Sequence, residues 1–161
     1  MAEKPILPLG DCLKEKFEAY EKHLGKAYET KKLDGFDVRR YKVSSKPNMA
    51  FIELTDWKSK TGTVNVVTVV FAKGSKVLHL DALKMLGIDD SHVAAVAAYP
   101  GDHSIQILTG LKAGKFVSGT IKSSSSGVIN PSGGDFGATF YKQFMAYEQG
   151  SVLQVECPPP L

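Results

Sequence analysis

A valine-rich run constrains the fold of this chain more than any other feature. Five of the nine residues from Thr63 to Phe71 are valine, and the run contains neither glycine nor proline. β-Branched side chains lose rotamer freedom in a helix and pack well on the pleated surface of a sheet. The run therefore predicts a buried strand, and the rest of the chain must supply strands that pair with it.

Short apolar segments separated by turn residues continue along the chain. Clusters rich in Gly, Pro, Asn and Ser separate these segments at intervals of about 8–12 residues, which is typical of antiparallel sandwiches and barrels. The predicted strands are Asp37–Val43, Met49–Thr55, Thr63–Phe71, Lys76–Leu80, His92–Tyr99, His103–Leu108 and Lys115–Ile121. We expect a mainly β fold, an antiparallel β-sandwich or barrel with one N-terminal amphipathic helix.

The N-terminal region carries this helix, predicted between residues 11 and 31 with Asp11 as its N-cap. Apolar side chains recur there at spacings of three and four, and charges of both signs occupy the other face. A membrane-binding helix would be rich in lysine on its polar face, so we favour docking on the domain core over a stripe that binds a membrane or a partner. The stripe consists of Leu13, Phe17, Tyr20, Leu24 and Tyr28.

The second half of the chain leaves an alternative open. Asp81–Gly87 is a predicted helical turn, and the serine and glycine residues of Ser123–Gly137 predict a loop. Residues 136–156 fit either one helix face or a β-hairpin, and the β-rich flanking sequence favours the hairpin. The organisation that we expect is an N-terminal helical segment (1–32), a β domain (33–122) and a C-terminal extension (123–161) that packs on the same domain.

Composition and charge exclude several classes of function. A net charge of +3 is too small to argue for nucleic-acid binding. The longest apolar run, Val93–Ala98, is too short to span a bilayer, and Ala2 replaces the glycine that N-myristoylation needs. Two cysteines are too few for a disulfide framework, and no secretory signal is expected. We expect an intracellular protein with reduced thiols and no cofactor, whose contact with membranes is at most peripheral.

No segment has the residue spacing that a catalytic or metal site needs. A thiol enzyme requires a histidine that deprotonates the cysteine, and neither Cys12 nor Cys157 has the neighbours of a papain-like nucleophile. His79 and Asp81, sharing a predicted strand face, give only a weak hint of a metal site. Asp89–Asp90 offers at most two adjacent carboxylates for calcium. We therefore expect no enzyme activity, no catalytic residue and no metal ligand.

The densest positive region lies where the β-rich part of the chain begins. Alternation along a strand places Arg39 and Arg40 on opposite faces, so the positive side chains cannot all line one face. We favour a solvated strand surface over an interface for an anionic membrane or an acidic, tubulin-like partner. The region comprises Lys31, Lys32, Arg39, Arg40, Lys42 and Lys46.

Two short motifs stand in a specific order. Phe71-Ala-Lys-Gly-Ser75 ends the valine-rich strand, and Tyr99-Pro-Gly-Asp102 has the residues of a tight turn between two strands. With Leu33–Phe36 and Met49–Phe51 before them, these motifs make residues 33–122 resemble the small calpain-like domain of kinetoplastid parasites. The motif residues, which we expect to be structural, are Phe71, Lys73, Gly74, Ser75, Tyr99, Pro100, Gly101, Asp102 and Gly110.

The resemblance implies a β-sandwich akin to an accessory domain of calpains, without the protease. It implies a non-catalytic interaction or scaffold domain in the cytoplasm, cytoskeleton or flagellum of a kinetoplastid cell, with protein partners. Open edge strands would also allow a dimer. The alternative is a β-sandwich or barrel that binds a small ligand or lipid inside, since the alanines of segment 94–98 leave space there. A cysteine-dependent enzyme is the third hypothesis.

Overall fold

The computed structural model of the chain describes residues 5–12, 14–43, 49–59, 61–73, 79–88, 93–99, 104–109, 136–141 and 152–156. The helices are α1 (Leu9–Cys12), α2 (Phe17–Leu24) and α3 (His79–Met85). The strands are β1 (Glu29–Leu33), β2 (Phe36–Tyr41), β3 (Met49–Thr55), β4 (Val66–Phe71), β5 (Val93–Tyr99), β6 (Ser104–Thr109), β7 (Phe136–Tyr141) and β8 (Val152–Glu156).

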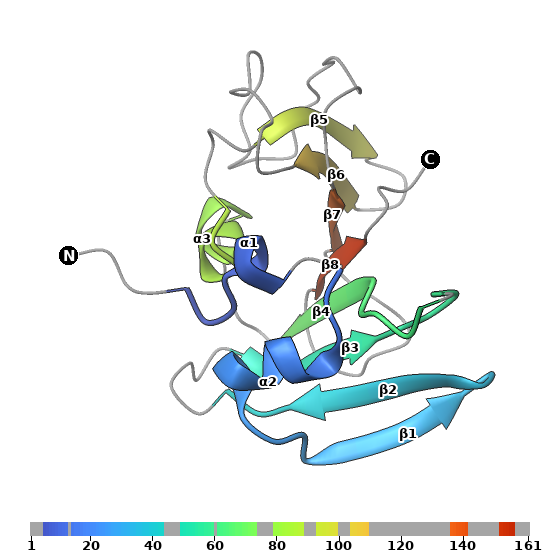
Figure 1. Ribbon diagram of the computed structural model, residues 1–161. Helices are drawn as coiled ribbons and strands as arrows, with labels where there is room; N and C mark the ends of the chain where they lie inside the picture. The colour runs from blue at the N-terminus through green and yellow to red at the C-terminus, as the bar shows by residue number, and fades with distance from the viewer. Residues whose placement is uncertain are drawn as a thin grey trace.

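These strands belong to a single antiparallel sheet (Figure 1). Its order is β1-β2-β3-β4-β8-β7-β6-β5, so the C-terminal strand β8 lies between β4 and β7. Each neighbouring pair is antiparallel. The edge strands β1 and β5 lie at opposite ends of the molecule in Figure 1. The prediction of a mainly β, antiparallel fold with an amphipathic helix near the N-terminus is confirmed.

The last six residues of the valine-rich run form β4, near the middle of the sheet, whereas residues 63–65, predicted as the start of this strand, lie in the segment before it. All six residues of this strand are buried, and β4 pairs with β3 on one side and β8 on the other. A strand that is covered on both faces needs apolar side chains at successive positions rather than at alternate ones. This burial explains why valine dominates both faces of β4.

The helix predicted between residues 11 and 31 is wrong in its extent. Lys14 adopts a left-handed conformation with φ 60°, and it separates α1 from α2. Gly25, with φ 78°, ends α2, and its N–H donates to the carbonyl oxygen of Glu21 at 2.9 Å. Asp11, the predicted N-cap, lies inside α1. The chain after Gly25 enters the edge strand β1 instead of continuing as a helix.

Docking of the apolar stripe is confirmed for the part of it that forms α2. Phe17 and Tyr20 are buried in the core, and Leu24 packs against the same cluster. Tyr28 lies beyond the end of α2 and is 47% exposed. Leu13 lies outside the described residues.

The helix α3 replaces part of a predicted strand. The structure makes His79 and Leu80 helical, whereas Lys76–Leu80 was expected to be extended; residues 76–78 lie outside the described part. The helical turn predicted after this point is confirmed, with Leu83 and Leu86 buried. The sequence His-Leu-Asp-Ala-Leu-Lys-Met consists largely of good helix formers, which outweighs the short alternation before it.

Two further antiparallel pairs complete the sheet. β5 pairs with β6, with Tyr99 opposite Ser104, and the predicted Pro100–Asp102 turn lies outside the described residues. β7 pairs with β8, which confirms strands rather than a helix at Phe136–Tyr141 and Val152–Glu156; residues 142–151 lie outside the described part. The predicted strand Lys115–Ile121 lies outside the described residues.

The two faces of the sheet have different surroundings. The inner face packs against the three helices, and its side chains share one core cluster with Leu7, Cys12, Leu83 and Leu86. The outer face carries a smaller apolar cluster of Phe51, Val70 and Val152. The inner face of β2, β3, β4 and β8 contributes Tyr41, Met49, Ile52, Leu54, Val67, Val69, Phe71, Leu153 and Val155 to the large cluster.

Candidate functional site

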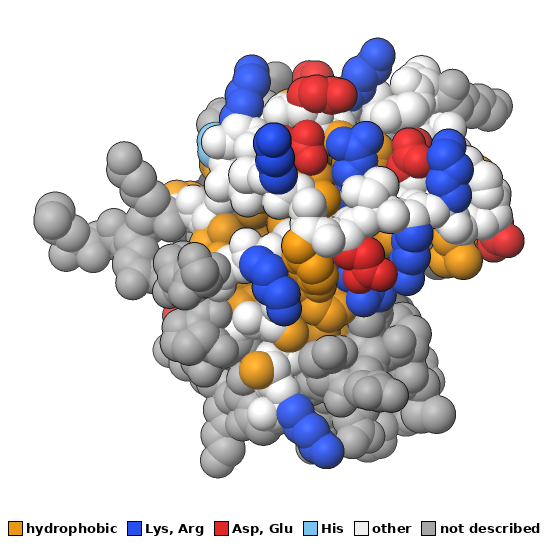
Figure 2. All heavy atoms as spheres, turned by 90° about the horizontal axis from the view of Figure 1, so that it is seen from below, with side chains coloured by type: hydrophobic (Ala, Val, Ile, Leu, Met, Phe, Trp, Pro, Cys, Tyr) orange, Lys and Arg blue, Asp and Glu red, His pale blue; other side chains and the backbone are white. Residues whose placement is uncertain are grey.

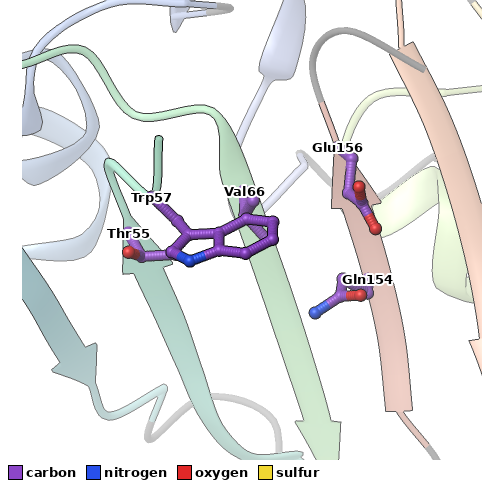
Figure 3. A pocket seen from close by; sticks show the side chains of 5 residues that line it. All are labelled: Thr55, Trp57, Val66, Gln154 and Glu156. Atoms are coloured by element: carbon purple, nitrogen blue, oxygen red, sulfur yellow. The ribbon is translucent and has the colours of Figure 1, made fainter. Parts of the chain in front are cut away.

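A pocket of ≈ 340 Å³ opens on the outer face, near the end of β3 and the start of β4 (Figure 3). Thr55, Val66 and Glu156 occupy one register row across β3, β4 and β8. Gln154 lies two residues earlier on β8, and Figure 3 shows its side chain pointing toward the indole of Trp57. The pocket therefore combines an aromatic wall and one valine with a hydroxyl, an amide and a carboxyl group.

Trp57 is held by hydrogen-bonded residues between β3 and β4, here called the Trp57 loop (residues 56–59 and 61–65). The side-chain amide of Asn65 donates to the backbone carbonyl of Trp57. The Ser59 N–H donates to the carbonyl oxygen of Asp56 at 2.8 Å, and the Asn65 N–H donates to that of Thr55 at 3.1 Å. These bonds fix the backbone on both sides of the indole.

Hydroxyl groups close the tip of the same loop. Ser59 Oγ accepts from the backbone N–H groups of Thr63 at 3.1 Å and Thr61 at 3.3 Å. The Val64 N–H donates to the carbonyl oxygen of Glu15 at 2.8 Å, which ties the loop to the N-terminal segment. Short polar side chains of this kind replace regular secondary structure as partners of the loop backbone. The loop thus presents Trp57 in a preset position.

The electrostatics of the pocket centre on Glu156. Burial raises the pKa of this half-buried carboxyl group above its ordinary value. No cation among the described residues forms an ion pair with Glu156. In the same pocket, Trp57 is 44% exposed, and Lys58 Nζ lies 4.3 Å from its ring centroid. A partly desolvated acid and an accessible aromatic ring therefore line the same pocket.

A row of polar side chains crosses the outer face beside the pocket. Arg40 Nε lies 2.8 Å from Glu53 Oε2, and Arg40 Nη1 lies 3.5 Å from Glu29 Oε2. The register continues from Glu53 to Thr68 on β4 and from Thr68 to Gln154 on β8. Gln154 Nε2 donates to Thr68 Oγ1 at 3.4 Å. The row links the pocket to an ion-pair network near the sheet edge.

The predicted separation of Arg39 and Arg40 onto opposite faces is confirmed. Arg39 points to the inner side, where its guanidinium lies 4.2 Å from the Phe17 ring and 3.5 Å from Glu21. Arg40 lies over Phe51 of the outer cluster, at 4.5 Å from the ring centroid. Figure 2, viewed from the β1–β2 end of the molecule, shows basic and acidic side chains interspersed. This mixture supports the solvated surface that the sequence favoured for the basic region.

The motif residues inside the described part of the chain have structural positions. Phe71 ends β4 and is 2% exposed, Lys73 is exposed directly after that strand, and Tyr99 ends β5. The other motif residues, Gly74, Ser75, Pro100, Gly101, Asp102 and Gly110, lie outside the described residues. The structure does not bring the described motif residues into the pocket.

The titratable residues that the sequence singled out do not form a site in the described part of the chain. The Cys12 thiol is buried and donates to the carbonyl oxygen of Pro8 at 3.3 Å. His79 and Asp81 lie on α3, which corrects the expectation of a shared strand face. Among the described residues, no three His, Cys, Asp or Glu side chains are grouped as metal ligands would be. Cys157, His92, His103, Asp89 and Asp90 lie outside this part.

Sequence reasoning missed the pocket. Trp57 is the only tryptophan of the chain and stands in a loop of short polar residues, which was an available signal. Gln154 and Glu156 gave no such signal, because their position depends on β8 pairing with β4.

Comparison with known proteins identifies no relative of this chain. In the described part of the chain, no helix combines the length and apolar character required to cross a membrane. No family model, curated protein or solved structure matches this chain.

Proposed function

We propose that this chain is a non-catalytic binding domain that engages a partner at the Trp57 pocket. The observation that carries the proposal is an exposed indole beside a half-buried acid, an amide and a hydroxyl. Tryptophan is enriched among residues that dominate binding energy, because it buries a large area at a small cost in conformational entropy.

The structure of the Trp57 loop supports the same proposal. A loop that must order upon binding loses affinity, since its conformational entropy opposes association. Here the bonds from Asn65 and Ser59 already hold the loop before any partner arrives. The ordering cost at this surface is therefore small.

The resemblance to small calpain-like proteins supplies the class of partner within this proposal. It supports a protein partner at the cytoskeleton or membrane, and a location in the cytoplasm, cytoskeleton or flagellum of a kinetoplastid cell. The Phe71–Ser75 and Tyr99–Asp102 motifs carry this part of the proposal.

The test is a quantitative capture of partners by the purified chain from a kinetoplastid lysate. We expect Trp57→Ala to abolish the capture of proteins that the natural chain enriches. Tyr28→Ala is the matched control, because Tyr28 is 47% exposed, similar to the 44% of Trp57, but lies beside β1. Capture that is equal for both variants and the natural chain would rule out the pocket as the binding site.

The small-ligand alternative is favoured by one observation, the size of the pocket. A volume of ≈ 340 Å³ falls within the range of small-molecule sites. A fragment screen followed by the fluorescence of Trp57 would test it. Saturable binding of a fragment that Trp57→Ala removes supports a ligand at this pocket rather than inside the sheet.

A further inference from the structure

We infer that the Trp57 pocket takes a cationic side chain, the guanidinium or ammonium group of an arginine or lysine on the partner. This inference rests on the proposed function, because it assigns the occupant of the same pocket. Three features of the pocket carry it: the acid, the aromatic ring and the remaining polar groups.

The acid is the first feature. A carboxylate that is partly removed from water is unfavourable unless a cation or hydrogen-bond donors compensate for its charge. No ion pair involves Glu156 in the described part of the chain. Elsewhere on the same face, Glu53 and Glu29 each have Arg40 as their partner. Unlike these two acids, Glu156 forms no ion pair with a described residue. A basic side chain of the partner can supply the missing positive charge.

The aromatic ring is the second feature. The face of an indole attracts cations through its quadrupole, more strongly than the rings of tyrosine or phenylalanine. Lys58 Nζ lies 4.3 Å from the ring centroid of Trp57, so an incoming cation must use the remaining exposed surface of the indole and rely on Glu156 to offset repulsion from Lys58. With 44% of its surface exposed, Trp57 retains area for a second contact.

The polar groups are the third feature. Gln154 uses its Nε2 to donate to Thr68, which leaves its Oε1 as an acceptor. The hydroxyl of Thr55 can also accept, and the carboxylate of Glu156 only accepts when ionised. Guanidinium and ammonium groups carry donors only, so their bonding pattern complements that of this pocket.

The overall charge of the chain makes the inference specific. The net charge is +3, so the protein as a whole does not attract cations. Binding of a basic side chain must then come from the local groups of the pocket. Neutralising Glu156 alone should therefore remove most of the attraction.

The sole tryptophan makes a direct test practical, because its fluorescence reports on this pocket alone. The probe is N-acetyl-arginine methylamide, and the matched neutral probe is the citrulline compound, which has nearly the same shape. We expect a saturable change with the arginine probe and an affinity at least about tenfold lower for the citrulline probe. An equal response to both probes, or no saturable response to the arginine probe, would overturn the inference.

Two variants of equal charge complete the test. Glu156→Gln should reduce the affinity for the arginine probe by about tenfold. Glu18→Gln removes the same charge from the exposed face of α2 and should leave the affinity unchanged. The thermal unfolding of both variants shows that they are folded. An unchanged affinity in Glu156→Gln would overturn the inference.

The outcomes also separate this inference from the proposed function. If partner capture depends on Trp57 but the arginine probe does not bind, the pocket is the binding site and its occupant is not cationic. If capture is independent of Trp57, the proposed function fails, whatever the probe does.

Discussion

The inner and outer faces of the same sheet differ in how their side chains are partnered. On β4, Val67 and Val69 of the inner face share one core with the helices, whereas Val70 of the outer face belongs to a smaller cluster with Phe51 and Val152 among the described residues. Outer-face Thr68 and Val66 lie beside polar side chains and the pocket. The comparison indicates that the inner face supplies most of the stability and that the outer face carries the pocket.

The largest expected effect tests the inner face. Leu54 is 0% exposed and lies in the large core cluster, so Leu54→Ala removes apolar contacts and leaves a cavity. We expect the free energy of unfolding to fall by about 2–5 kcal/mol. Urea denaturation measures this change.

The outer-face counterpart is Val66→Ala, at the pocket. Val66 is 6% exposed, and the space beside it is already open. Its truncation loses mainly the transfer free energy of the removed groups, about 1–2 kcal/mol. Equal losses in Leu54→Ala and Val66→Ala would contradict the assignment of stability to the inner face.

The next prediction compares ion pairs that differ in burial, starting with the more buried pair on the outer face. Arg40 and Glu53 form an ion pair with a separation of 2.8 Å, and only 13% of the Glu53 side chain is exposed. Glu53→Gln weakens this charge-assisted bond, and we expect a loss of about 1–2 kcal/mol in the free energy of unfolding. The measurement is again urea denaturation at neutral pH.

Lys32 provides the control for the ion-pair prediction. Its ion pair with Asp37 is 3.4 Å long, but 73% of the lysine side chain is exposed. Lys32→Gln should therefore change the free energy of unfolding by less than about 0.5 kcal/mol. A larger loss for Lys32→Gln than for Glu53→Gln would show that burial does not decide the strength of these pairs.

The inner face was the more predictable of the two, because it obeys simple patterns. The residues from Met49 to Thr55 were predicted as a strand with the bounds that the structure has. The edge strand β1 was not predicted, since Glu29–Leu33 is largely exposed and has no alternation of apolar and polar residues. Its backbone conformation is imposed by pairing with β2, which no local pattern encodes.

The pocket could not be predicted for a related reason. Val66 and Glu156 are neighbours only because β8 pairs with β4 rather than with another strand. Register between strands far apart in sequence is a tertiary property, set by packing of both faces. The residue types of the site can be read from the sequence, but their proximity depends on strand pairing that no local pattern predicts.

The smallest expected effect concerns the acid of the pocket. Burial raises the pKa of Glu156 in the folded chain above its ordinary value of 4.5, so folding favours the protonated carboxyl. This preference adds to the free energy of unfolding at pH values below the pKa of Glu156 in the unfolded chain. The contribution is lost as the pH rises through the pKa of Glu156 in the folded chain. Glu156→Gln cannot ionise and does not undergo this loss.

We therefore expect Glu156→Gln to be more stable than the natural chain at neutral pH and to lose this advantage near pH 4. Because the group is only half-buried, the gain should be at most about 0.5 kcal/mol. Thermal unfolding across this pH range measures it. A variant that is less stable at neutral pH would show that Glu156 has a stabilising partner within the chain. A small gain in stability, combined with a loss of arginine binding, is the pattern of a residue retained for function at a cost in stability.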